Sequence, residues 1–504
     1  MIRRTLDLHL PPRPHATTAG IFAARVLLLV FALGIFSLLS TGFFSNAQGL
    51  VSYTVLLLWY LFVEAIALWT RDKRLFWLNP IIIASIFSIA LPFGISNIVF
   101  ALPAHMIVRA GLQTTVTVWM NQLMLLVILG GSAMWIGYGS KAGRSLGGML
   151  QRNTVLKSWM SLSTRVRKST IWTFVLISLI ARLFSIKMGI YGYSATDSSL
   201  MAGAGYREYL AYAESLGRLA LVGLAIESFA PGRKDLTNRL ALISVFCYEV
   251  LFGFLSGFKT PVVLPLVIVG MAFYSQRNRF PRWIVPAIVV GVLAAYAVIE
   301  PFRATRNDDP TFDGTSLSGI ISTMSDETSM KAYDIGAKAP VGIQFLARNN
   351  LTYMGSLGIE YASLGKLPPG SPDFLADLFL VPVHAVIPRA IWSSKPIVKL
   401  GLWYTNVVLG KDLMSSAAMS PFTYLNFAGG PLAVILGFLF VGIIQRGLFD
   451  GLRSYGGGGV IVLLGLLTTL GVIDSAFDTV FIYVIRLFPM LVVAQYLMIE
   501  RQRK

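Results

Sequence analysis

The stretch GIFAARVLLLVFALGIFSLLST, residues 20–41, contains a single charged residue, Arg25. An apolar run of this length is long enough to cross the hydrocarbon core of a bilayer as an α-helix. Similar runs recur along the whole 504-residue chain, which is 55% hydrophobic and has a mean hydropathy of +0.69. The sequence therefore predicts a polytopic membrane protein and excludes an ordinary soluble domain.

The apolar runs predict about twelve membrane-spanning helices. A helix satisfies its backbone hydrogen bonds within one segment, and the alternating short strands of a membrane barrel are not seen in this sequence. The first run has no small-residue cleavage site at its far end, so we expect it to remain as the first span. The expected fold is all-α and polytopic, with spans at residues 20–41, 50–69, 80–102, 114–138, 170–190, 214–230, 240–257, 261–276, 283–300, 428–445, 456–473 and 479–498.

Basic residues alternate between the segments that connect these spans. The formal net charge is +18, and every second connecting segment is rich in Lys and Arg, beginning with the N-terminal segment. Such an excess marks the cytoplasmic side of a membrane protein, so we expect both termini in the cytoplasm. Membrane topology then explains most of the positive charge, which therefore does not indicate a nucleic-acid partner. The single cysteine, Cys247, allows no disulfide framework and no cysteine-based metal site.

The largest segment between predicted spans is residues 301–427, which the charge pattern places on the outer face. It holds ten Lys and Arg on the side where these residues are normally scarce. We therefore expect a membrane bundle of about nine helices over residues 1–300, a large outer loop over 301–427, and C-terminal membrane helices over 428–504. Residues 374–392 are apolar but short and interrupted by proline, which predicts a re-entrant or interfacial helix pair within the loop.

The stretch HAVIPRAIWSSKP, residues 384–396, places cations inside this apolar outer segment. Arg389 can contact phosphate oxygens through two parallel hydrogen bonds and Lys395 adds a point charge, so the pair suits a lipid-linked pyrophosphate. Contact with anionic lipid headgroups is the alternative. The further cations that we expect to bind the same anion on the outer side are Lys259, Arg207, Arg303 and Arg348.

A general base that could accept a hydroxyl proton is expected in the same outer loop. His384 lies five residues before Arg389, and a neutral imidazole can accept a proton near pH 7. Glu360 is the competing candidate, and a structural role is the alternative for His384. The predicted catalytic residues are therefore Arg389, His384 and Glu360.

The sequence gives no support for a metal or a cofactor. The aspartates of NDDPTFDG, residues 307–314, are not followed by an EF-hand pattern, and the first outer loop, GFFSNAQG, has no acidic residue. Motifs for nucleotide hydrolysis, zinc proteases and serine hydrolases are also missing from the sequence. We therefore expect a site that works without metal.

Several cations fall inside or at the ends of predicted spans. Such a residue costs roughly 2.5–3.5 kcal/mol on insertion scales and usually has a partner or a water-filled cavity. The residues concerned are Arg182, Lys187, Arg218, Lys259 and Arg486. The alternatives to a functional role are snorkelling to the interface and a structural pair with Glu64, Glu227 or Glu249.

Three stretches together resemble bacterial O-antigen and exopolysaccharide polymerases of the Wzy type. SGFKTPVVLPLVIV is similar to the turn with a glycine and a basic residue that opens a span in that family, and VIPRAIWSSKP resembles its Pro-Arg-x-x-Trp-x-x-Lys-Pro element. SPFTYLNFAGGPLAVILGFLFVGIIQR resembles its Tyr-x-Asn-Phe entry into a span. Lysine stands at position 259 where arginine is frequent in the family. The resemblance implies that five residues of this chain occupy substrate-binding positions of the family: Lys259, Arg389, Lys395, Tyr424 and Asn426.

The resemblance implies a glycosyltransferase of the bacterial inner membrane with a fold like that of the GT-C enzymes. Such an enzyme polymerises oligosaccharide repeat units linked to undecaprenyl pyrophosphate at the periplasmic face and releases undecaprenyl pyrophosphate. The implied partners are the lipid-linked oligosaccharide, membrane lipids and a chain-length-regulating co-polymerase.

The chemistry of such a donor agrees with the residues. A lipid-linked pyrophosphate is already a good leaving group, cations stabilise the charge that develops on it, and one base takes the acceptor proton. Displacement at the anomeric carbon without a nucleophilic carboxylate inverts the configuration, so we expect an inverting enzyme that needs no metal.

Three other functions are compatible with the sequence. An O-antigen ligase uses the same donor but transfers the glycan to a lipid A-core acceptor. A lipid-linked oligosaccharide flippase or a secondary transporter predicts repeated halves and charges along many mid-membrane positions, whereas the charges here gather in one outer segment. A non-catalytic membrane scaffold is the third possibility.

Overall fold

The structure is a computed structural model and its described part is almost entirely helical. The described residues are 16–71, 79–160, 163–194, 206–232, 235–277, 279, 282–308, 315–325, 340–365, 367–387, 392, 400–410, 419–471 and 476–500. In this part of the chain the β pairing is limited to one isolated bridge, between Val166 and Ile499. The prediction of an all-α protein is confirmed.

Ten helical spans in the described residues are long and apolar enough to cross a membrane. They are formed by α1 (Ala16–Ser40), α2 (Asn46–Arg71), α4 (Pro80–Phe93) continued by η1 (Ile95–Ala101), α6 (Val118–Gly139), α9 (Lys168–Lys187), α11 (Arg207–Phe229), α12 (Leu236–Leu255), α13 (Lys259–Arg277), α21 (Pro421–Arg453) and α24 (Phe477–Met498). This is the architecture of a multi-pass membrane protein.

Two of the twelve predicted spans correspond to shorter apolar helices. The apolar part of α14 (Ile284–Asp308) covers Ile284–Ile299, and α22 (Gly456–Gly465) ends just before the short α23 (Leu467–Leu470). Helix α14 itself continues to Asp308, so the helix of 25 residues is longer than its apolar stretch, whereas α22 ends at Gly465 inside the predicted span 456–473. Ten long apolar spans are thus present in the part of the chain that the structure describes.

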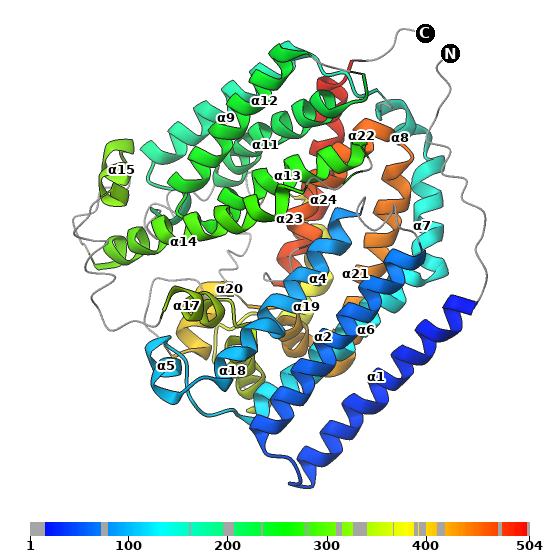
Figure 1. Ribbon diagram of the computed structural model, residues 1–504, viewed down its shortest axis with the longest axis vertical. Coiled ribbons are helices and arrows are strands. Elements are labelled where there is room, and N and C mark those ends of the chain that lie inside the picture. The colour runs from blue at the N-terminus through cyan, green and yellow to red at the C-terminus, as the bar shows by residue number, and fades with distance from the viewer. Residues whose placement is uncertain are drawn as a thin grey trace.

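The remaining helices are short, and several gather at one end of the bundle. Figure 1 shows α5, α17, α18 and α20 at the end that lies away from both chain termini. The short helices are α5 (Ala104–Arg109), α7 (Lys141–Arg152), α8 (Thr154–Trp159), η2 (Gly192–Ser194), α15 (Leu317–Ser325), α17 (Val341–Arg348), α18 (Leu351–Ser363), α19 (Phe374–Val386), α20 (Leu400–Trp403) and η3 (Tyr404–Val408).

The long helices pack into two groups, each around its own apolar core. The first core is built mainly by α2, α6 and α21, with α18 and α19 added from the segment between α14 and α21. The second core is built by α9, α11, α12 and α13 together with α22 and α24. Residues near the C-terminal end of α21 reach the second core, so α21 connects the two groups.

The crossing of α6 and α21 depends on two glycines. A Cβ atom added at Gly137 would lie 2.1 Å from the carbonyl oxygen of Leu439, and one added at Gly442 would lie 1.9 Å from that of Met134. Helices in a bilayer gain their association energy from such close packing, because the lipid tails are as apolar as the side chains. Gly137 and Gly442 therefore set how closely the two helices approach.

Helix α21 is bent where the predicted span began. Gly430 has φ +66, a left-handed conformation that favours glycine, and Pro431 follows it. The half of α21 before this bend carries Tyr424, which is fully buried in the first core. The segment that sequence predicted as an entry into the span is thus itself helical and packed inside the protein.

Helix α19 forms the first half of the predicted re-entrant or interfacial pair, and it packs against α24 and α21. Its last carbonyl groups receive hydrogen bonds from Arg486 of α24, whose Nε donates to Ala385 O at 2.9 Å and whose Nη2 donates to His384 O at 2.7 Å. Helix ends leave carbonyl groups without intrahelical partners, so Arg486 caps α19. The second half of the pair falls largely outside the described residues.

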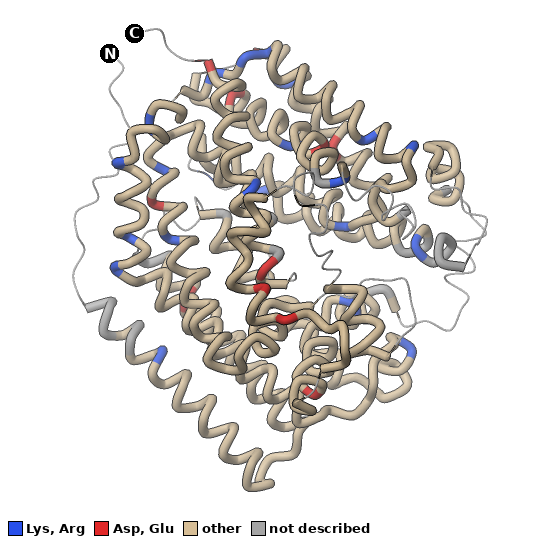
Figure 2. The backbone as a smooth tube through the Cα atoms, turned by 180° about the vertical axis from the view of Figure 1, so that it is seen from behind, with Lys and Arg blue, Asp and Glu red and all other residues tan. Residues whose placement is uncertain are grey.

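Two buried or part-buried ion pairs account for cations within the spans. Both oxygens of Glu249 accept hydrogen bonds from Arg182 Nη2, at 2.9 and 2.8 Å, and Arg25 pairs with Glu64 at 2.6 Å. For Arg182 the structure therefore shows the structural pair with Glu249 that the sequence left open as an alternative to a functional role. Figure 2 shows that charged residues occupy little of the long helices and that Lys and Arg lie largely toward their ends.

Candidate functional site

A tight turn between α12 and α13 forms the base of the candidate site. Gly257 in this turn has φ +65, and a Cβ atom there would lie 2.7 Å from the Phe302 ring. The turn is held on its other side by Tyr193 of η2, whose backbone N–H donates to Ser256 O at 2.8 Å. Gly192 has φ +59, and a Cβ atom would lie 2.1 Å from the same Ser256 oxygen. Glycine is therefore required on both sides of this contact.

Lys259, the first residue of α13, follows this turn directly. Its ammonium lies 3.3 Å from the centre of the Tyr296 ring of α14. A cation over the face of an aromatic ring is attracted by the ring quadrupole. Asn349, just after α17, donates to Tyr296 Oη at 3.0 Å, and Phe345 of α17 packs edge to face against the same ring at 5.1 Å. The ring is thus fixed from two sides.

Arg303 approaches the turn from the C-terminal part of α14. Its Nε donates to Gly257 O at 2.8 Å, and its guanidinium carbon lies 4.5 Å from the ring centre of Tyr193 and 5.4 Å from that of Phe258. Burial lowers the pKa of Arg303 from its ordinary value, while Tyr193 and Tyr296 act in the opposite direction. The ordinary pKa of arginine is so high that the group stays charged near pH 7.

Arg348 comes from a third part of the fold. It is the last residue of α17, its side chain is exposed, and it interacts electrostatically with Lys259 and Tyr296. Helix α17 is anchored through Ala347, which belongs to a small apolar core with residues of η1 and α5. Three basic residues, from α13, α14 and α17, therefore lie within electrostatic reach of one tyrosine. We name this set the cation cluster; it comprises Lys259, Arg303, Arg348, Tyr193 and Tyr296.

The cluster has the chemistry of an anion site. Guanidinium groups present several donors to phosphate oxygens in a fixed plane, and an ammonium adds a compact charge with three donors. Like charges brought together also repel one another, and a bound anion relieves that repulsion. In the described part of the chain no group of three or more His, Cys, Asp or Glu side chains is arranged to hold a metal ion.

The other residues that the sequence predicted for the site differ in how far their side chains are exposed to solvent. His384 is buried near the end of α19, where its ring faces Trp392 with centroids 5.7 Å apart. Glu360 is exposed near the C-terminal end of α18, and Arg207 is exposed at the start of α11. Arg389 and Lys395 lie outside the described residues.

Tyr424 and Asn426 lie in the packed half of α21. Tyr424 is 0% exposed, and its hydroxyl donates to Phe374 O at 3.3 Å. Its ring packs edge to face against Phe374 at 5.3 Å, and Asn426, two residues further along, is partly buried. The contacts of Tyr424 are those of a core residue that ties α21 to α19.

Sequence reasoning missed the aromatic half of the cluster. Tyr296 stands in an apolar run and was taken as part of a span, yet it precedes Arg303 by seven residues, about two turns of helix. That spacing places both side chains on one face of α14. Tyr193 carried no comparable signal, because its position depends on the contact of η2 with the turn.

Comparisons with known proteins identify a family whose description gives no function. No curated protein and no solved structure matches the chain. A family model described as a domain of unknown function, DUF8712, matches residues 208–470, a range that includes Lys259, Arg303 and Arg348. Because this match covers more than half of the 504 residues, the chain belongs to the DUF8712 family.

Proposed function

We propose that this protein is a membrane glycosyltransferase that polymerises oligosaccharide repeat units carried on undecaprenyl pyrophosphate. The observation that carries the proposal is the meeting of Lys259, Arg303 and Arg348 around Tyr296. These cations come from three different helices, and bringing like charges together is costly unless an anion is bound. A diphosphate attached to a lipid fits a site at the end of a membrane bundle.

The position of the cluster supports a substrate that stays in the membrane. Lys259 begins α13 and Arg303 lies near the end of α14, each next to an apolar stretch of its helix, and Arg348 lies on a short helix at the end away from both termini. A polyprenyl tail can then remain among lipid tails while its headgroup reaches the cations. The sugar extends away from the membrane toward α17 and α18.

The proposed reaction is a direct displacement. The acceptor hydroxyl oxygen bonds to the anomeric carbon of the donor, and the bond from that carbon to the pyrophosphate oxygen breaks. The electron pair leaves with undecaprenyl pyrophosphate, where Arg303 and Arg348 stabilise the charge, and the hydroxyl proton passes to a base. His384 and Glu360 are the proposed bases. The reaction inverts the configuration at the anomeric carbon.

The proposed location is the bacterial inner membrane, with both termini in the cytoplasm and the cluster at the periplasmic face. The alternation of basic connecting segments supports this orientation. The arrangement would be of the GT-C kind, in which a membrane bundle carries the reacting groups at its outer end. A chain-length-regulating co-polymerase is the proposed protein partner.

The test uses Arg303→Gln and Arg348→Gln in the native host at normal expression, with the surface glycan separated by size on a gel. We expect both variants to shorten the ladder strongly, because each removes a group that holds the leaving pyrophosphate. Lys141→Gln, an exposed cation on α7, is the matched control and should leave the ladder unchanged. Unaltered long chains in both arginine variants would overturn the proposal.

The same gel separates polymerase from ligase. Loss of a polymerase leaves glycan acceptors capped with a single repeat, whereas loss of a ligase leaves acceptors with no repeat. Single capped repeats in the arginine variants support the polymerase. Bare acceptors would reassign the same donor site to a ligase.

A further inference from the structure

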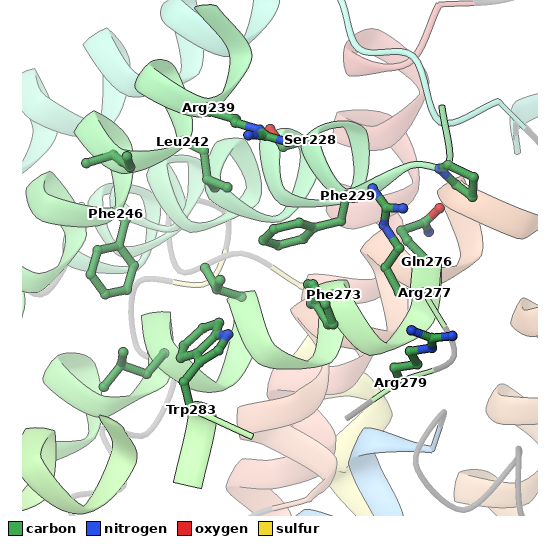
Figure 3. Close-up of a pocket in the computed structure, with 14 residues that line it drawn as sticks. Ser228, Phe229, Arg239, Leu242, Phe246, Phe273, Gln276, Arg277, Arg279 and Trp283 are labelled. Atoms are coloured by element: carbon green, nitrogen blue, oxygen red, sulfur yellow. The ribbon is translucent and has the colours of Figure 1, made fainter. Parts of the chain in front are cut away.

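A second site lies at the opposite end of α12 and α13 from the cation cluster. A cavity of about 1010 Å³ opens between the end of α11, the helices α12 and α13, and the start of α14. Figure 3 shows the side chains that line it. Lys259 and Arg277 are the first and last residues of α13, so a helix rise of 1.5 Å per residue separates the two sites by about 27 Å.

One side of this cavity is apolar and rich in aromatic rings. Phe229 and Phe273 pack edge to face with ring centroids 5.1 Å apart, and Phe246 and Trp283 line the wall as well. In Figure 3 Phe246 and Trp283 lie on the side of the cavity away from Gln276. Side chains of this kind bury the hydrocarbon part of a ligand without any polar partner.

The other side is basic. Arg277 ends α13, Arg279 follows it, and Arg239 lies in the first turns of α12. Helices α12 and α13 are joined by the tight turn at their other ends and run in opposite directions, so the start of α12 and the end of α13 lie at the same end of the bundle. All three arginines are exposed, and none has an ion pair with a carboxylate among the described residues. The described lining includes no Asp or Glu.

We propose that this cavity binds a phospholipid with an anionic headgroup, taken from the leaflet that faces the basic end of α12 and α13. The three arginines contact the phosphate and the headgroup, and the aromatic wall receives an acyl chain. Basic pockets between membrane helices hold anionic headgroups in this way, and each Lys or Arg near the headgroup raises the affinity about fivefold. Membrane topology predicts basic residues at this end of the bundle, and the structure adds that these three line one cavity together with an aromatic wall.

The experiment is native mass spectrometry of the purified full-length protein in detergent, titrated with phosphatidylglycerol or with phosphatidylcholine of the same chains. We expect a saturable adduct with phosphatidylglycerol and a much weaker one with phosphatidylcholine. The triple variant Arg239→Gln, Arg277→Gln, Arg279→Gln should bind phosphatidylglycerol roughly a hundredfold less. A second variant, Ile243→Trp, fills the apolar wall while keeping the arginines and should also lose the adduct.

The control removes the same amount of charge elsewhere. Lys141, Arg152 and Lys157 are exposed cations of α7 and α8 that do not line the cavity, and their triple Gln variant should bind as the unaltered protein does. Equal adducts in the two triple variants would overturn the proposal, as would equal binding of the two lipids. Displacement of the lipid by inorganic phosphate at similar concentration would also overturn it, because the site would then recognise a free anion. None of these outcomes bears on the cation cluster, so the two proposals fail separately.

Discussion

The ammonium of Lys259 lies 3.3 Å from the centre of the Tyr296 ring, which joins the start of α13 to the middle of α14. This contact fixes the Lys259 side chain at the end of a membrane bundle against an uncharged ring. A carboxylate in place of the ring would pair with the lysine and weaken its attraction for a phosphate. The contact therefore positions the Lys259 amine where an anion can meet it.

The first prediction concerns this ring. Tyr296→Leu removes the aromatic face and should weaken binding of undecaprenyl pyrophosphate by about five- to thirtyfold, since a desolvated cation–π contact contributes roughly 1–2 kcal/mol. Tyr296→Phe keeps the ring and loses only the hydrogen bond from Asn349, so its effect should be much smaller. Titration of the purified protein with the lipid measures both. Equal losses in the two variants would contradict a role for the ring face.

The second prediction concerns the turn beneath Lys259. Gly257→Ala introduces a strained left-handed residue and a Cβ atom 2.7 Å from Phe302, so unfolding should occur at a lower temperature and Arg303 should lose its carbonyl partner. Gly232→Ala is the matched control, because Gly232 has φ +82 but nothing lies within 4 Å of its added Cβ atom. The control should cost only the backbone strain, about 1 kcal/mol. Thermal unfolding in detergent compares the two variants, and equal shifts would exclude a steric contribution at Gly257.

The third prediction concerns the buried ion pair of α9 and α12. Arg182→Met leaves Glu249 buried without its cation and should lower the free energy of unfolding by about 3–5 kcal/mol. The double variant Arg182→Met, Glu249→Leu removes both charges and should recover most of that loss. Chemical denaturation of the two variants gives the comparison. A double variant no more stable than Arg182→Met would mean that the pair does more than neutralise its own charges.

The fourth prediction concerns the crossing of α6 and α21. Gly137→Ala places a methyl group against the Leu439 carbonyl and should destabilise the protein by about 1–3 kcal/mol. Gly131→Ala lies on the same helix where nothing is within 4 Å of the added Cβ atom, so it should be neutral or slightly stabilising. Melting temperatures of the two variants report the difference. A harmless alanine at position 137 would show that the helices separate easily there.

Hydropathy predicted the all-helical membrane fold well because it acts over whole segments. The ten long spans follow from apolar length, whereas the apolar stretch of α14 is shorter than the helix and α22 ends early, at a point that depends on local contacts. Arg486 shows a further difficulty. Its position in a span suggested either function or snorkelling, but its partners are backbone carbonyls of α19, which lie about a hundred residues away in the sequence.

The cation cluster was only partly visible in the sequence. Lys259 stood out as a charge in the turn between two apolar runs, and the large number of outer cations drew attention to Arg303 and Arg348. Tyr193 and Tyr296 did not, because an aromatic residue in an apolar segment is normally a core residue. Their role depends on which helix ends meet, and this is a property of tertiary packing.

The cluster draws its charges from helices that are anchored in different apolar cores. Lys259 and Arg303 belong to α13 and α14, which share a small core, while Arg348 sits on α17, which is anchored beside η1 and α5. A diphosphate bound as we propose would offset the repulsion among these charges and draw α17 toward α13 and α14. Occupancy of the proposed site and the position of α17 would then be linked.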